Sequence, residues 1–127
     1  MVDMFNNEKA MGRFRDFITD RIVLVTVSLA LILTGLVSWL LYTKFHQQTE
    51  FVPLHYNIYF GIDLYGPWYQ ILTLPATGLG LLFINFILSF ILYKRVKLFS
   101  YALLISLDLC GLMLLGSGWL IVSQLLT

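Results

Sequence analysis

Three long apolar segments separated by polar stretches dominate the hydrophobic pattern of the chain. They are residues 22–42, 71–93 and 98–121, and each approaches or exceeds the about 20 mostly apolar residues that a helix needs to cross a bilayer. The first is longer than the apolar part of a signal peptide, and no small-residue cleavage site follows it. We therefore expect a retained anchor and an all-α integral membrane protein with three transmembrane helices.

The composition supports a lipid environment. Of the 127 residues, 59% are hydrophobic and 12% are charged, whereas soluble domains have about 45–50% and about 25%. The net charge of +1 provides no basic face for phosphates, so we expect no nucleic-acid partner. Cys110 is the single cysteine, which excludes an intramolecular disulfide.

The basic residues predict how the chain lies in the membrane. All except Lys44 precede the first segment or lie between the second and third: Lys9, Arg13, Arg15, Arg21, Lys94, Arg95 and Lys97. By the positive-inside rule, the N-terminus faces the cytoplasm of a multi-pass cell-membrane protein. The extracytoplasmic parts are then the C-terminus and a connector of about 28 residues, 43–70.

Two regions follow from this pattern, a cytoplasmic head over residues 1–21 and a single membrane domain over 22–127. The head has apolar side chains at helical spacing on one arc, opposite most of its charges, which predicts an amphipathic helix at the inner interface. The apolar residues of this arc are Met4, Met11, Phe14, Phe17 and Ile18.

Local signals predict how the three helices are arranged. The short basic turn after residue 93 makes the second and third helices antiparallel neighbours, and Pro75 marks either the start of the second helix or a kink near its outer end. Small residues allow helices to approach closely in lipid. We therefore expect two ladders to pack within the chain or against another copy: Thr26, Ala30, Thr34 and Ser38, and Ala102, Ser106 and Cys110.

Asp108 lies near the middle of the third apolar segment, where a charge costs about 2.5–3.5 kcal/mol on insertion scales. Asn85 in the second segment is at a similar distance from the connecting turn and is the expected hydrogen-bond partner. The pair would clamp the two helices. Recognition of a basic group on a partner, and ion coupling, are the alternatives.

The connector 43–70 combines aromatic side chains with turn residues. The aromatic residues suit the headgroup layer, while Gly61 and Gly66-Pro67 predict turns. His46, His55, Asn57 and Asp63 do not follow a tight metal-ligand spacing, so we expect no metal and no cofactor. No nucleophile–base set or pair of carboxylates is apparent, and we expect no enzymatic activity.

One pattern in this connector resembles a known family. Pro53, His55, Tyr56, Asn57, Gly61, Asp63 and the later Pro75 are similar to the outer loop of the Sdp-type immunity-protein family, whose defining domain is a small membrane domain of unknown function. Three residues separate Asn57 from Gly61 here, where the family usually has two. The resemblance implies immunity to a secreted, membrane-active toxin.

Three functions are compatible with the sequence. The first is a non-enzymatic, immunity-like or ligand-sensing membrane protein that recognises an extracytoplasmic peptide through His55, Tyr56, Asn57, Gly61 and Asp63. The second is an accessory subunit of a larger membrane complex, and the third is an ion-coupled transporter that acts as an oligomer.

Overall fold

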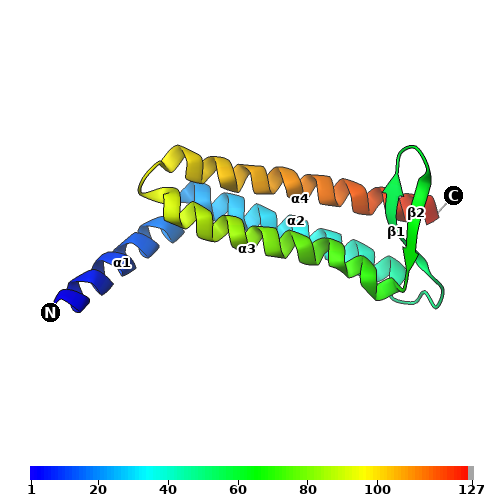
Figure 1. Ribbon diagram of the computed structural model, residues 1–127, viewed down its shortest axis with the longest axis horizontal. Helices are drawn as coiled ribbons and strands as arrows, with labels where there is room; N and C mark the ends of the chain where they lie inside the picture. The colour runs from blue at the N-terminus through cyan, green and yellow to red at the C-terminus, as the bar shows by residue number, and fades with distance from the viewer. Residues whose placement is uncertain (126–127) are drawn as a thin grey trace.

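The chain folds into three long helices with a helical extension at one end and a small hairpin at the other (Figure 1). The computed structural model describes residues 1–125, except for the side chains of Tyr56 and Leu125. The elements in chain order are α1 (Val2–Thr19), α2 (Arg21–Phe45), β1 (Val52–Asn57), β2 (Gly61–Gly66), the 3-10 helix η1 (Trp68–Leu72), α3 (Thr73–Tyr93) and α4 (Lys97–Leu125).

Helices α2, α3 and α4 lie side by side and are long and apolar enough to cross a membrane. The 25 residues of α2 extend over about 37 Å at about 1.5 Å each, more than the hydrocarbon core of about 30 Å. Large apolar side chains such as Val25, Ile32, Phe83 and Met113 are exposed on the outer faces. The predicted three apolar helices are confirmed; α2 and α4 are somewhat longer than predicted, and α3 begins two residues later.

The N-terminal head is a helix, as predicted, and it projects away from the bundle (Figure 1). It ends where Asp20 takes an extended conformation, with ψ at 127°. The Asp20 carboxylate then accepts a hydrogen bond from the Ile22 amide at 2.9 Å and caps α2. Met4, Met11 and Phe14 are exposed, while Phe17 is buried against α3.

The small-residue ladder of α2 is part of the bundle interior. Thr26, Ala30 and Thr34 are buried and Ser38 is partly buried, which confirms the predicted packing face. The two threonines donate their hydroxyls to backbone carbonyls one turn earlier, which satisfies them without a partner on another helix.

The ladder predicted on α4 does not pack inside the chain, so its packing against another copy stays a prediction. Ala102, Ser106 and Cys110 are exposed. The inner face is instead set by other residues: Ser100, Leu104, Leu107, Gly111 and Gly118. At 3.6 residues per turn, the centre of this inner face lies about 130° around the helix from the centre of the predicted ladder.

Glycines make the close contacts between helices. A Cβ atom on Gly111 would lie 3.1 Å from Leu33 Cδ1 of α2. A Cβ atom on Gly78 of α3 would lie 3.0 Å from Leu114 Cδ1 of α4. Both distances are tighter than ordinary van der Waals contacts, so α4 approaches its two neighbours most closely where side chains are absent.

The predicted short connection between α3 and α4 is confirmed, and one buried serine lies on each side of it. The Ser100 hydroxyl donates to the Ser89 carbonyl at 2.8 Å, and the two hydroxyls are also hydrogen-bonded to each other. In an environment without water each of these groups needs a partner. The pair therefore fixes the antiparallel register of the two helices close to their turn.

The connector 43–70, which we expected to be a loop with turns, also contains two strands. They form the antiparallel hairpin β1–β2, with Val52 opposite Gly66 and Asn57 opposite Gly61, so the all-α prediction is incomplete here. Helix α3 begins at Thr73, and Pro75 lies in its first turn, where the missing amide removes no helical hydrogen bond. Of the two predicted alternatives, the helix start is confirmed.

Candidate functional site

The turn of the hairpin is built by two residues of the predicted recognition motif. The Asn57 side-chain oxygen accepts a hydrogen bond from the Tyr59 amide at 2.9 Å, which is an Asx-type turn. Gly61 closes the turn with φ at +75°, a conformation that is costly for residues with a Cβ atom. Asn57 and Gly61 therefore shape the hairpin.

His55 and Asp63 join the two strands. The Nδ1 atom of His55 and Oδ1 of Asp63 are 2.7 Å apart. Both side chains are well exposed, so the contact is a solvated cross-strand pair. Such pairs contribute about 0.2–1 kcal/mol to a sheet. The structure thus brings together His55, Asn57, Gly61 and Asp63, and gives each a role in forming the hairpin.

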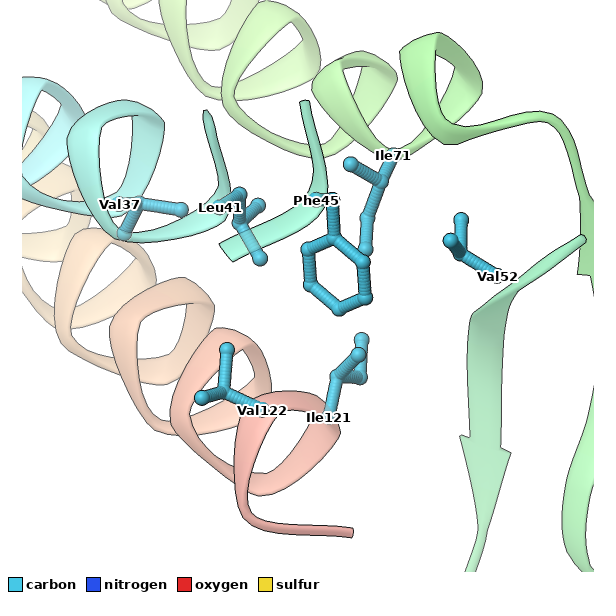
Figure 2. Close-up of a cluster of buried hydrophobic side chains, with 7 residues drawn as sticks. All are labelled: Val37, Leu41, Phe45, Val52, Ile71, Ile121 and Val122. Atoms are coloured by element: carbon cyan, nitrogen blue, oxygen red, sulfur yellow. The ribbon is translucent and has the colours of Figure 1, made fainter. Parts of the chain in front are cut away.

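The base of the hairpin is anchored in an apolar cluster at the adjacent end of the bundle (Figure 2). Side chains from β1, η1, α2 and α4 meet there: Val37, Leu41, Phe45, Val52, Ile71, Ile121 and Val122. Gly66 permits this approach, since a Cβ atom at that position would lie 2.5 Å from both Leu54 Cδ1 and Gln70 Oε1. The hairpin is therefore positioned by the helices.

The tip of the hairpin presents three consecutive large apolar residues. Ile58, Tyr59 and Phe60 have relative exposures of 81%, 87% and 84%. The hairpin runs across the ends of the helices, roughly perpendicular to them (Figure 1). We expected Tyr59 and Phe60 only as members of an aromatic belt and did not single out Ile58. The sequence did contain a signal for a turn at residues 58–60, because the turn-forming residues Asn57 and Gly61 flank them.

A cleft lies beside the base of the hairpin. It has a volume of about 580 Å³ and is lined by residues of the α2–β1 connection and of the segment after β2: Gln48, Thr49, Glu50, Phe51, Pro67 and Trp68. This volume is within the range of about 300–1,000 Å³ that is typical of ligand pockets. Two aromatic side chains, several polar groups and one carboxylate form its walls.

Within the bundle, Asp108 lacks the partner that we expected. The residue is 9% exposed, and its Oδ1 atom has no hydrogen-bond partner in the described part of the chain. The predicted bond to Asn85 is therefore wrong. The Ser89–Ser100 pairing places Leu104 at the level of Asn85 in the antiparallel helices, so Asp108 lies one helical turn further out.

A polar junction at the opposite end of the bundle was missed. Asp20 Oδ2 accepts hydrogen bonds from the hydroxyls of Tyr93 and Tyr101, each at 2.6 Å, and lies 3.9 Å from Lys97 Nζ. The partners are 73 and 81 residues away, so no local pattern predicts them. The junction joins the α1–α2 boundary to α3 and α4.

The junction also controls the ionisation of Asp20. Burial raises the pKa of its carboxyl, but the tyrosine hydroxyls, the Ile22 amide and the nearby lysine together outweigh that effect. They hold the Asp20 pKa below its usual value, because hydrogen bonds to the charged form stabilise it. Asp20 is therefore an anion at neutral pH.

The chain shows no likeness to characterised proteins that would assign these sites. Comparison with family models, curated proteins and solved structures finds no match. The resemblance of residues 53–75 to the immunity-protein family thus stays a prediction. Among residues 1–125, no group of three or more histidine, cysteine and acidic side chains is close enough to hold a metal.

Proposed function

We propose that the protein is a small, non-enzymatic cell-membrane protein whose hairpin recognises a peptide at the outer membrane surface. Its N-terminus and the α3–α4 turn lie in the cytoplasm, in agreement with the basic residues at that end. The hairpin, the cleft beside it and the C-terminus lie outside. The main observation behind this proposal is the exposed tip, Ile58, Tyr59 and Phe60, on a hairpin that the bundle holds in place.

The chemistry of the tip and cleft favours a peptide as the ligand. A two-stranded sheet leaves backbone groups unpaired along its edges, which a further extended chain can pair with. Exposed aromatic and aliphatic side chains at the tip supply apolar anchors. The cleft with Phe51, Trp68 and Glu50 provides a neighbouring pocket that suits a basic or apolar side chain.

The resemblance to the immunity family supports the same proposal. A membrane-active peptide lies flat in the interface before it inserts. The hairpin runs across the helix ends (Figure 1), so in a bilayer its tip is at the depth where such a peptide collects. Capture there would keep the peptide from permeabilising the membrane.

Peptide selection on the intact chain in lipid nanodiscs tests recognition. A displayed random-peptide library is enriched on the protein after removal of binders to empty nanodiscs. We expect selected peptides to bind Tyr59→Ser/Phe60→Ser at least tenfold more weakly. The matched control, Tyr65→Ser/Tyr69→Ser, removes two exposed tyrosines from the same connector and should bind within twofold of the unmodified chain.

Two results would contradict the proposal. One is a lack of enrichment over empty nanodiscs. The other is equal loss in the tip and control variants, which would make the aromatic residues a lipid anchor. Orientation is tested separately with Phe60→Cys in a Cys110→Ser background: a membrane-impermeant maleimide should label intact cells, and labelling only after lysis would reverse the topology.

Asp108 favours a second candidate function, that of a subunit in a homo-oligomer or a larger membrane complex. A buried carboxylate oxygen without a partner is costly, and a basic or hydroxyl group of a neighbouring chain would satisfy it. Ala102, Ser106 and Cys110 form a separate, exposed face of the same helix, which allows close approach of a neighbouring helix. Detergent-solubilised protein should then migrate as a larger complex that Asp108→Leu dissociates.

A further inference from the structure

A cleft with three cations lies at the end of the bundle opposite the hairpin. Its volume is about 210 Å³, below the range of about 300–1,000 Å³ typical of small-molecule pockets. It is lined by residues from α1, α3 and the α3–α4 turn: Arg13, Phe90, Ile91, Tyr93, Lys94 and Arg95. The size suits a small anionic group.

Aromatic contacts between α1 and α3 create this cleft. The rings of Phe14 and Phe90 meet edge to face with centroids 5.8 Å apart, and Phe17 contacts Phe90 at 5.4 Å. Helix α1 then diverges from the bundle (Figure 1). Arg13 precedes Phe14 in α1, so these contacts hold its helix beside the end of α3.

The three cations, Arg13, Lys94 and Arg95, lack an ion-pair partner in the described part of the chain. Lys97 differs, since its Nζ lies 3.9 Å from Asp20 and 5.0 Å from the centre of the Tyr93 ring. Like charges gathered around one cavity repel one another, and an anion in the cavity would remove that repulsion.

The usual preference for basic residues at helix C-termini and on the cytoplasmic side explains only part of this arrangement of charges. Lys94 and Arg95 follow the C-terminus of α3, where cations complement the helix dipole, and they also satisfy the positive-inside rule. Neither rule requires Arg13 of a different helix to line the same cavity. The convergence of the three charges is the feature that points to a ligand.

We propose that this cleft binds a phosphate group, the chemistry shared by anionic phospholipid headgroups and soluble phosphate esters. Arginine binds phosphate oxygens in a bidentate manner, and lysine adds a point charge. Ile91 is an exposed apolar wall that continues onto the outer face of α3, so the acyl chains of a lipid can follow the helix. Basic pockets at this depth suit lipid headgroups.

This inference depends on the proposed insertion of the bundle and not on peptide recognition by the hairpin, so the two tests fail independently. The test is native mass spectrometry of the full chain in mild detergent, titrated with phosphatidylglycerol or phosphatidylcholine. We expect at least a tenfold preference for phosphatidylglycerol. Arg13→Gln/Lys94→Gln should weaken phosphatidylglycerol binding at least tenfold.

The control is Lys9→Gln/Arg15→Gln, which removes one lysine and one arginine from the same end without touching the cleft, and it should stay within twofold. If the double variant loses its helical circular dichroism, Arg95→Gln is compared with Arg15→Gln. Displacement of the lipid by millimolar glycerol phosphate would assign the site to soluble phosphate esters, and resistance to it would assign the site to lipid. Equal binding of both lipids, or equal loss in both double variants, overturns the proposal.

Discussion

Replacement of Asp20 by alanine should destabilise the bundle more than any other single change at a charged residue of the end opposite the hairpin. The change removes the acceptor of two tyrosine hydroxyls at 2.6 Å and the N-cap of α2 at 2.9 Å. Hydrogen bonds to a charged group contribute about 1.5–3 kcal/mol each, and an N-cap about 1 kcal/mol. These contributions sum to about 4–7 kcal/mol if nothing replaces the carboxylate.

The expected loss is smaller, because 12% of the Asp20 side chain is exposed and water can replace the acceptor for one hydroxyl. We expect about 3 kcal/mol from the lower end of these values. Asp20→Asn should lose about half as much, since asparagine caps a helix as well as aspartate but lacks the charge.

Unfolding in mixed micelles with increasing dodecyl sulfate, followed by tryptophan fluorescence, measures this free energy. Asp16→Ala is the matched control, because this exposed aspartate of α1 has no side-chain partner in the described part of the chain. An Asp20→Ala protein that unfolds within about 0.5 kcal/mol of this control, the usual range for surface changes, would refute the idea that the junction holds the helices together.

Four further outcomes are expected. Because the folded-state pKa of Asp20 lies below its ordinary 3.8, its stabilisation should be complete above about pH 4 and lost as the pH falls further; Asp20→Asn should remove this part of the acid dependence in the same titration. Gly61→Ala should destabilise the hairpin by about 1 kcal/mol through backbone strain alone, seen as faster amide exchange over 52–66, whereas Gly80→Ala, also in open space, should not. Asp108→Leu should leave the monomer at least as stable in micelle unfolding, and a clear loss would mean that the carboxylate is bound within the chain. If a second copy packs on the exposed face of α4, oxidation in membranes should cross-link the native Cys110, and a wholly monomeric product on a non-reducing gel would exclude that face.

The helices could be predicted from the sequence, but their contacting faces could not. A run of about 20 apolar residues predicts a spanning helix whichever way it is rotated. On α2 the small residues coincided with the buried face, whereas on α4 Ala102, Ser106 and Cys110 face outward. Lipid is as apolar as the protein interior, so the hydrophobic pattern contains no inside–outside signal.

The hairpin shows why a motif can be found and its role misjudged. His55, Asn57, Gly61 and Asp63 were recognisable as unusual for an interfacial loop, yet the strands around them lack regular alternation and were not predicted. Their contacts show that they form the turn and join the strands. The residues left for recognition are those of the turn, of which we had assigned Tyr59 and Phe60 to an aromatic belt and had not singled out Ile58.

The serine pair beside the α3–α4 turn has a consequence for how the protein is made. Its members are only 11 residues apart, so this contact closes a short loop and forms early. A nascent chain leaving the ribosome can thus lock α3 to α4 before the register against α2 is decided. Biogenesis would then proceed by docking a finished helical pair onto an anchor that has been waiting in the lipid.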